Sequence, residues 1–236
     1  ADTLQKHLPE LPVQSKYSWK DILYNFWGIY FCGGDCIEDL SVHLKSAFND
    51  NPNIETPSAD RVLDRMKELA LPSDYKFAPR GKARHQFSIN KELNTLNISI
   101  LKKNLKFSQK EVVLDYDNTL IFTKKADAAK TYKKQFGYAP GIGLIGSNIV
   151  YVENRNGNSA APNLQEETLE RMFDLLTEQG IKINKFRADG GSYKLSVLSV
   201  IRKYVDKFYI RANMNQSLEE AISQIKDWKK VKLEDK

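Results

Sequence analysis

The chain has too few cysteines for a fold held together by disulfides. Its 236 residues include two, Cys32 and Cys36, and histidine is almost as scarce, with three scattered residues. Two thiols cannot build a disulfide framework, and they fall short of the four ligands of a closed structural zinc site. The sequence therefore argues against a disulfide-rich secreted module and against a zinc-organised domain.

Long apolar runs are missing as well. No stretch approaches the roughly 18 residues that a membrane helix needs, and the first residues include Asp2, Lys6 and His7 where a secretion signal has an apolar core. By contrast, 41% hydrophobic and 11% aromatic residues are ordinary for a chain that buries a core. We therefore expect a soluble intracellular protein of one large or two modest domains, without membrane contact.

The positive charge of the chain is unevenly distributed. The formal net charge is +6, yet residues 1–60 are net acidic, whereas residues 61–110 hold twelve Lys and Arg against four Asp and Glu. A basic block of this kind suits a polyanion such as the DNA backbone, because each neutralised phosphate releases counterions. A lysine-rich surface that only contacts water explains the charge equally well, so composition alone leaves both interpretations open.

The first third of the chain has helical periodicity. Ser18 can cap a first helix, Asp35 with Glu38 predicts the start of a second, and Pro57-Ser58 opens a third, whose Arg61, Arg65 and Lys67 are left for solvent. Short helices ending in one with exposed arginines resemble a helix-turn-helix module, in which the last helix enters the major groove. The signal is weak by itself, because small helical bundles with charged faces are common.

The pattern loosens after the third helix. From Leu71 to Lys110, prolines, a Gly and a run of Asn and Lys favour a linker with short ordered pieces, of which 93–101 is expected to pack on a neighbour. We therefore divide the chain into a helical DNA-binding domain at 1–75, a connecting segment at 76–108 and a catalytic core at 109–236.

Two acids end the most apolar strand of the chain. The segment VVLDYDNTLI, residues 112–121, delivers Asp115 and Asp117 on alternate positions at the end of that strand. Acids placed there typically hold a metal ion, because hard cations take oxygen ligands. Two unrelated enzyme classes share this local pattern, so the segments that follow it must decide between them.

The second half continues with alternating strands and helices. GIGLIGSNIVYVENR reads as a β-hairpin with its turn at Gly146-Ser147-Asn148. A helix at 163–179, a strand at 181–189, a helix, a strand at 207–212 and a last helix follow. Three antiparallel strands and then alternating helices and strands are the RNase H-like order.

That order brings a second acid to the first strand. A right-handed crossover through the helix at 163–179 would lay the strand ending at Asp189 parallel to the strand carrying Asp117. Two carboxylates at neighbouring strand ends can hold one or two Mg²⁺ ions, and such a pair of ions can assist an in-line phosphodiester displacement. The expected fold is thus α/β, or α+β for the whole chain: an RNase H-like mixed sheet with flanking helices, preceded by an all-α helix-turn-helix-like domain.

The rival interpretation is a phosphatase of the haloacid-dehalogenase type, whose first motif is also Asp-x-Asp-x-Thr after an apolar strand. Asp115 would then be the nucleophile, Asp117 the acid/base and Thr119 a helper, with Mg²⁺ among the acids. Its later elements fit poorly, since that fold continues with a flap and parallel strands and this sequence continues with a tight hairpin.

The motifs together resemble one family. VVLDYDNTLI, KTYKKQFGYAPGIGLIGSNIVYVENRNGNSA, INKFRADGGSY and FYIRANMN are similar to the bacterial insertion-sequence transposases of the DDE type, in the branch whose first strand is Leu-Asp-x-Asp-x-Thr. The resemblance covers most of residues 18–215. It implies a bacterial cytoplasmic enzyme that binds double-stranded transposon ends, acts as a homodimer, and cuts and joins DNA with Mg²⁺ or Mn²⁺.

Carried over residue by residue, the resemblance makes Asp117 and Asp189 the catalytic and metal-binding acids and Asp115 a further candidate ligand. It also implies a third acid, a Glu on a later helix, and no stretch of this chain matches it. The chain is therefore expected to be the first part of a transposase, with phosphodiester transfer belonging to the full-length protein. A DNA-binding fragment without catalysis is the alternative. The candidate DNA-binding residues are Arg61, Arg65, Lys67, Arg80, Lys82, Arg84, Lys124 and Lys125.

Overall fold

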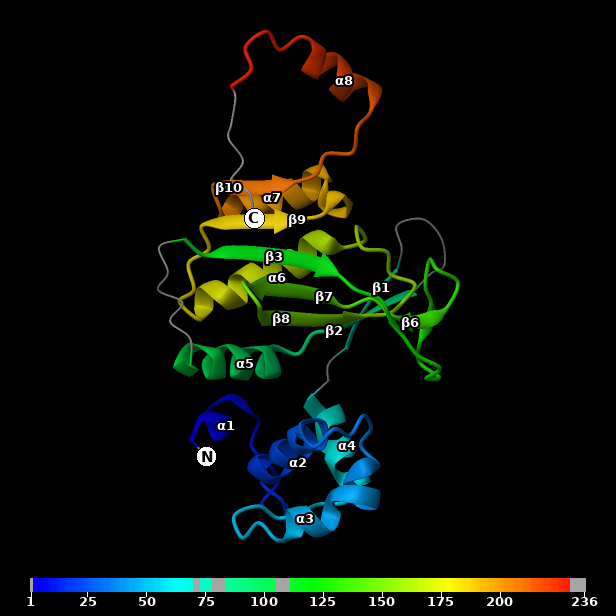
Figure 1. Ribbon diagram of the computed structural model, residues 1–236, viewed down its shortest axis with the longest axis vertical. Coiled ribbons are helices and arrows are strands. Elements are labelled where there is room, and N and C mark those ends of the chain that lie inside the picture. The colour runs from blue at the N-terminus through cyan, green and yellow to red at the C-terminus, as the bar shows by residue number, and fades with distance from the viewer. Residues whose placement is uncertain (1, 70–72, 78–83, 105–110, 230–236) are drawn as a thin grey trace.

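The computed structural model describes residues 2–69, 73–77, 84–104 and 111–229 (Figure 1). Its helices are α1 (Asp2–His7), α2 (Trp19–Phe31), the π-helical turn η1 (Leu40–Leu44), α3 (Lys45–Asn49), α4 (Ala59–Leu69), α5 (Lys91–Asn104), α6 (Gln165–Glu178), the 3-10 turn η2 (Gly190–Ser192), α7 (Leu195–Tyr204) and α8 (Gln216–Ser223). Its strands are β1 (Ser73–Phe77), β2 (Arg84–Ser88), β3 (Val113–Asn118), β4 (Ile121–Phe122), β5 (Ala129–Lys130), β6 (Phe136–Tyr138), β7 (Gly141–Ile145), β8 (Asn148–Arg155), β9 (Lys185–Ala188) and β10 (Lys207–Ile210).

A seven-stranded sheet in the order β1-β2-β8-β7-β3-β9-β10 organises the second half. β7 is antiparallel to both β3 and β8, whereas β9 lies parallel to β3 and β10 parallel to β9. From β8 to β10 this is the RNase H-like order expected from the sequence, with three antiparallel strands followed by two parallel additions. The mixed α/β sheet with flanking helices is therefore confirmed.

The β7–β8 hairpin turns where the sequence predicts it. Ile145 pairs with Asn148, which leaves Gly146 and Ser147 as the two turn residues. Gly146 has a φ of +61°, a conformation that glycine adopts without steric cost and that tight hairpins require. α6 then carries the chain back across the sheet, so that β9 pairs with β3.

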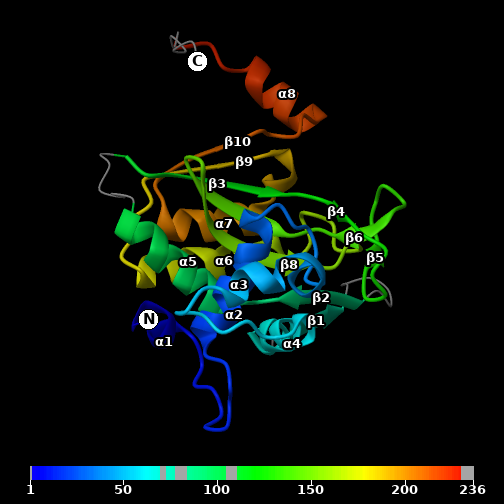
Figure 2. The same ribbon diagram turned by 60° about the horizontal axis from the view of Figure 1, so that its bottom comes forward.

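One face of the sheet is covered and the other is open. Leu114, Tyr116 and Phe186 pack against α6 and α7 in a core that also includes Phe173 and Ile201. In Figure 1 these two helices lie behind the strands, and Figure 2 shows them on the same side of the sheet after the rotation. We call the opposite side the open face, because in the described part of the chain no helix packs against it.

The N-terminal helices form a second core. Ile22, Leu23 and Leu40 are fully buried there together with Val62. Ser18 caps α2 through a reciprocal capping box with Asp21, and α4 starts directly after Ser58, both as predicted.

The second helix starts later than the sequence indicates. The prediction that Asp35 caps it is wrong, because the Oδ2 of Asp39 accepts the backbone N–H groups of Asp35 and Cys36. These bonds close a turn at that point, and the helical segment begins at Leu40.

The segment predicted to connect the domains contains ordered elements. β1 spans the predicted boundary at residue 75 and, with β2, belongs to the seven-stranded sheet. α5 contributes Ile98 to the sheet core and Leu96 to the helical core. This helix therefore links the two cores through its side chains.

No helix in the described residues is both long and apolar enough to cross a lipid bilayer. The last helix, α8, has no buried residue, and it stands clear of the rest of the molecule in both ribbon views (Figures 1 and 2).

Candidate functional site

The two acids of β3 lie on the open face. Residues alternate between the two faces of a strand, and Leu114 (0% exposed) and Tyr116 (2% exposed) are in the core. Asp115 and Asp117 therefore both point away from α6 and α7. Asp117, near the end of the strand, is exposed.

Parallel pairing brings the end of β9 beside the end of β3. The last paired residues are Tyr116 and Ala188, so Asp117 and Asp189 are the next residue on each strand. Both carboxylates are exposed. The structure thus places the two strand ends side by side, as the crossover argument expects.

Each of these two carboxylates makes one local backbone hydrogen bond. The Oδ1 of Asp117 accepts the N–H of Asn118 at 2.8 Å. The Oδ1 of Asp189 accepts the N–H of Gly191 at 3.0 Å, which caps the η2 turn. These bonds fix the orientation of the carboxyl groups and leave the second oxygen of each available to a ligand.

Asp115 has a different partner, which the sequence reasoning missed. Arg187 on β9 donates its Nε–H to Oδ1 at 2.6 Å and an Nη2–H to Oδ2 at 2.7 Å. The hydrogen bond from Arg187 to Asp115 raises the pKa of the guanidinium above its usual value. Both oxygens of Asp115 are thus engaged, and its charge is balanced across the strands.

A sequence signal for Arg187 did exist. Asp115 and Arg187 are 72 positions apart, and so are Asp117 and Asp189, since 189 − 117 = 72. Parallel pairing that aligns the second pair must also place the first pair opposite one another. The register that brings the two acids together therefore predicts the ion pair.

Of the three acids on these strands, Asp115 is engaged by Arg187, so Asp117 and Asp189 are the two whose carboxylates remain available to a cation. Among the described residues, the one group of three potential ligands with their donor atoms within 4.8 Å of one another is Asp35, Cys36 and Asp39. In that group the carboxylate of Asp39 closes the turn by accepting the N–H groups of Asp35 and Cys36, and these hydrogen bonds, the one from Asp35 first, lower its pKa. The carboxylates of Asp117 and Asp189 are of the oxygen type that Mg²⁺ and Mn²⁺ take as ligands, and a metal ion held by them stays a prediction.

The basic residues of α4 differ in availability. Arg65 binds Glu68 at 2.7 Å and Ser15 at 2.8 Å, and its side chain is 13% exposed. Arg61 and Lys67 are exposed.

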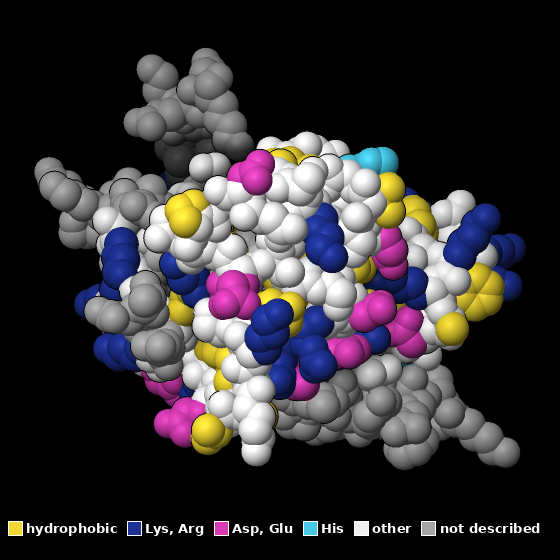
Figure 3. Space-filling view, turned by 90° about the horizontal axis from the view of Figure 1, so that it is seen from below, with side chains coloured by type: hydrophobic (Ala, Val, Ile, Leu, Met, Phe, Trp, Pro, Cys, Tyr) yellow, Lys and Arg dark blue, Asp and Glu magenta, His cyan; other side chains and the backbone are white. Residues whose placement is uncertain are grey.

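Three acids on the same helix, Asp60, Asp64 and Glu68, balance the three bases. Figure 3, which views the molecule from below, shows Lys and Arg interspersed with Asp and Glu on this face. The role of α4 in DNA binding stays a prediction.

The remaining candidate DNA-binding residues divide into two groups. Arg80 and Lys82 lie outside the described residues, as does the side chain of Arg84 at the start of β2. Lys124 and Lys125 are exposed in the segment 119–140, which follows β3 directly. We call this segment the finger.

No known family model matches the chain, and no curated protein matches it. The solved structures to which it has a low-level similarity include three of Mos1 transposase. One is a Mos1 transposase paired-end complex with left transposon end, at 10% identity and a TM-score of 0.33 over 92% of this chain and 73% of that chain. Another is the Mos1 strand transfer complex, at 12% identity and a TM-score of 0.33 over 92% and 66%. The third is a mariner Mos1 paired-end complex with Mg, at 11% identity and a TM-score of 0.29 over 91% and 75%. The fold rests on the strand order described above.

Proposed function

We propose that this chain is the DNA-binding and RNase H-like part of a DDE-type transposase of the insertion-sequence kind. The observation that supports the proposal is the position of Asp117 and Asp189, exposed at the ends of adjacent parallel strands. Double-stranded transposon ends are the proposed substrate, and phosphodiester cleavage and strand transfer the proposed reaction. A bacterial cytoplasmic location and a homodimer acting on paired ends belong to the same proposal.

In this proposal Asp117 and Asp189 hold the divalent cation, Mg²⁺ or Mn²⁺. When bound, the cation supplies Lewis-acid stabilisation of the scissile phosphate and activation of the attacking oxygen. The open face gives the DNA backbone access to both carboxylates, because in the described part of the chain no helix covers them. Lys124 and Lys125 follow β3 closely enough to contact phosphates next to the scissile one.

Arg187 acts on Asp115 in this scheme. By binding both oxygens, it reduces the negative charge that the open face presents to the phosphates of DNA. The same bond makes Asp115 a poor nucleophile, which counts against the phosphatase. The antiparallel pairing of β7 with β3 and of β8 with β7 also differs from the parallel strands that a phosphatase of that type requires.

The decisive experiment separates metal binding from DNA binding. Asp117→Asn and Asp189→Asn should each weaken Mn²⁺ binding by at least about tenfold, equivalent to about 1.4 kcal/mol, because each removes a charged oxygen ligand. Asp206→Asn, an exposed acid just before β10, is the matched control and should bind Mn²⁺ like the unmodified chain. Calorimetric titration measures the affinity, and electrophoretic mobility measures retention of DNA, which should stay nearly unchanged in all three variants.

Other outcomes would redirect the assignment. Unchanged Mn²⁺ affinity in both site variants would remove the proposed metal site. Hydrolysis of a generic phosphomonoester with Mg²⁺ that disappears in Asp115→Asn would establish the phosphatase instead.

A second candidate function, DNA binding without catalysis, is favoured by one observation. In the described residues no third acid joins Asp117 and Asp189 as a group of potential ligands. DNA and Mn²⁺ binding without nicking of a plasmid would support this second function, whereas metal-dependent nicking that is lost in Asp117→Asn would exclude it.

A further inference from the structure

The finger is a small sheet of its own at the end of β3. Its strands have the order β4-β6-β5, with Ile121 paired to Tyr138 and Lys130 to Phe136. The loop between β5 and β6 is closed by hydrogen bonds from Thr131 to the carbonyl of Gln135, and Lys134 has a φ of +65°. The finger starts only a few residues after Asp117, so whatever it binds lies next to the candidate site.

The finger is held firmly at its base. The Oδ1 of Asn156 accepts the N–H of Ala129 at 2.9 Å, and the N–H of Gly157 donates to the carbonyl of Gly137 at 3.0 Å. A Cβ at Gly157 would lie 2.3 Å from that carbonyl oxygen, so the contact requires glycine. The backbone of the finger is therefore held in place at its base, and so are the positions of its exposed side chains.

Small residues of the finger face inward and aromatic residues face outward. Ala128, Thr131 and Ala139 are buried, at 9%, 4% and 4% exposure. Phe122, Phe136 and Tyr132 are 46%, 56% and 75% exposed. Folding alone favours the reverse arrangement, since burial of aromatic area stabilises the native state. Phe122 pairs with Gly137 and Phe136 with Lys130, so these two rings lie on opposite faces of the small sheet. Several exposed aromatic rings in one short segment are typical of a binding surface.

The same segment is strongly basic. It contains five lysines, Lys124, Lys125, Lys130, Lys133 and Lys134, all exposed, against one acid, Asp127. Within the described part of the chain no ion pair joins these lysines to an acid, and Asp127 accepts a hydrogen bond from the hydroxyl of Tyr138 at 2.7 Å. The charge is therefore available to an external anion.

We propose that the finger binds unpaired nucleotides, with bases stacked on Tyr132 and Phe136 and phosphates held by the lysines. A duplex hides the faces of its bases, so lysines alone would serve for duplex binding. Exposed aromatics between lysines match a single strand, which offers stacking surfaces and charge together. The inference rests on the proposed function in taking DNA as the ligand, and it adds that the DNA is opened beside Asp117.

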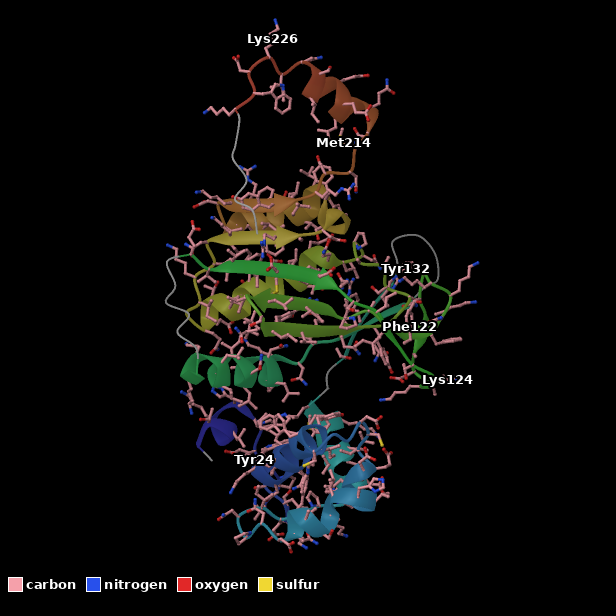
Figure 4. The ribbon with its side chains drawn as sticks, in the orientation of Figure 1. Tyr24, Phe122, Lys124, Tyr132, Met214 and Lys226 are labelled. Atoms are coloured by element: carbon pink, nitrogen blue, oxygen red, sulfur yellow. The ribbon has the colours of Figure 1, made fainter. Side chains whose placement is uncertain are left out.

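Figure 4 shows how local this surface is. Phe122, Lys124 and Tyr132 project from the finger, whereas Tyr24 lies among the N-terminal helices and Met214 and Lys226 lie towards α8. Tyr24 and Lys226 are also exposed and therefore serve as matched controls for the aromatic and lysine substitutions.

The test compares two DNA probes without divalent metal. One is a blunt duplex, and the other is the same duplex with a single-stranded overhang; fluorescence anisotropy measures both affinities. The unmodified chain should prefer the overhang. Tyr132→Ala and Phe136→Ala should each weaken overhang binding by roughly tenfold and leave blunt-duplex binding unchanged. Tyr132→Phe, which keeps the ring, should retain the preference, and Tyr24→Ala should behave like the unmodified chain.

Lysine variants should have a different signature. The double variant Lys124→Gln, Lys125→Gln should weaken both probes and reduce the slope of log affinity against log salt by about 1.4–1.8. Lys226→Gln should change neither. The thermal midpoint of each variant, followed by circular dichroism, verifies that the substituted chains fold.

The outcomes distinguish this inference from the proposed function. Duplex binding with no overhang preference, or a preference that survives Tyr132→Ala and Phe136→Ala, overturns the finger inference and leaves the metal site intact. A shift from dimer to monomer in the aromatic variants, with overhang preference unchanged, assigns the surface to a second copy of the chain. Conversely, the chain can prefer the overhang while its Mn²⁺ affinity is unchanged in Asp117→Asn. That result supports nucleotide binding by the finger and excludes the proposed metal site.

Discussion

Residues of β3 alternate between the buried side of the sheet and the open face, and Tyr116 is on the buried side. Its ring belongs to the sheet core, and within the described residues its hydroxyl has no hydrogen-bond partner. Burial raises the pKa of Tyr116 to about 12. Tyr116 thus carries an unsatisfied polar group on the buried side of β3, whereas its neighbours Asp115 and Asp117 face the open side.

Replacing Tyr116 with phenylalanine removes that group. We expect the free energy of unfolding at neutral pH to stay the same or to rise by up to about 1 kcal/mol, because no hydrogen bond is lost. Between pH about 10 and about 12 the unfolded chain loses the tyrosine proton and the folded chain keeps it, so the free energy of unfolding falls as the pH rises. Tyr116→Phe should therefore lose less of its free energy of unfolding over this pH range than the unmodified chain does, by at most about 2.7 kcal/mol.

Urea unfolding at neutral and alkaline pH measures the effect of Tyr116→Phe. The control is Tyr24→Phe, which removes an exposed hydroxyl from α2. If the free energy of unfolding falls equally steeply with pH in Tyr116→Phe and in the unmodified chain, Tyr116 does not contribute to the alkaline loss of stability.

At the scale of elements, α5 protects an edge of the sheet. β2 pairs with β8 at Phe87–Arg155 and Ser88–Asn154, and none of the described strands lies beside the earlier part of β8 on that side. Asn94 of α5 takes the place of a strand there. Its amide donates to the carbonyl of Val152 and accepts the N–H of Val152, both at 2.8 Å. Covering an edge in this way prevents pairing with another chain.

Asn94→Ala should therefore destabilise the chain. It removes the two hydrogen bonds that the buried Asn94 amide makes to the backbone of Val152, and we expect the free energy of unfolding to fall by about 1–3 kcal/mol, at about 0.5–1.5 kcal/mol for each bond. Asn97→Ala, which removes one more exposed bond to the carbonyl of Ile149, should cost less, about 0.5–1.5 kcal/mol. Equal losses in the two variants, measured by chemical denaturation, would contradict the assignment of the edge to Asn94.

Element boundaries show where sequence reasoning reached its limit. Asparagine lowers helix propensity, so the Asn-rich stretch before Lys102 favours a connecting segment. In the structure the same asparagines bond to β8, and this tertiary contact offsets the local cost. Hydrophobic period and motif spacing predict the strands of the core. They do not predict α5, because this helix depends on contacts between its asparagines and β8, which is distant in sequence.

At the scale of the whole molecule, α8 is peripheral. Met214, Ile225 and Trp228 are exposed around it, whereas Asn213 still contacts the body through a hydrogen bond to the carbonyl of Gly190. A chain ending at Met214 should unfold with a free energy within about 0.5 kcal/mol of the original, because no buried contact is removed. Thermal denaturation measures this, and limited proteolysis should cut first between residues 214 and 229. A large loss of stability would show that α8 packs on the body in solution.

The sequence by itself determined the alternation that puts Asp115 and Asp117 on one face, the β7–β8 hairpin, and the order of elements that leads to an RNase H-like sheet. These follow from local period, turn chemistry and the handedness of the crossover. The tertiary structure alone decided that α5 covers the edge of β8 and that the finger exposes its aromatic rings. Each of these depends on which distant groups are in contact, and contacts between distant groups are set by packing and strand register, which a local pattern does not encode.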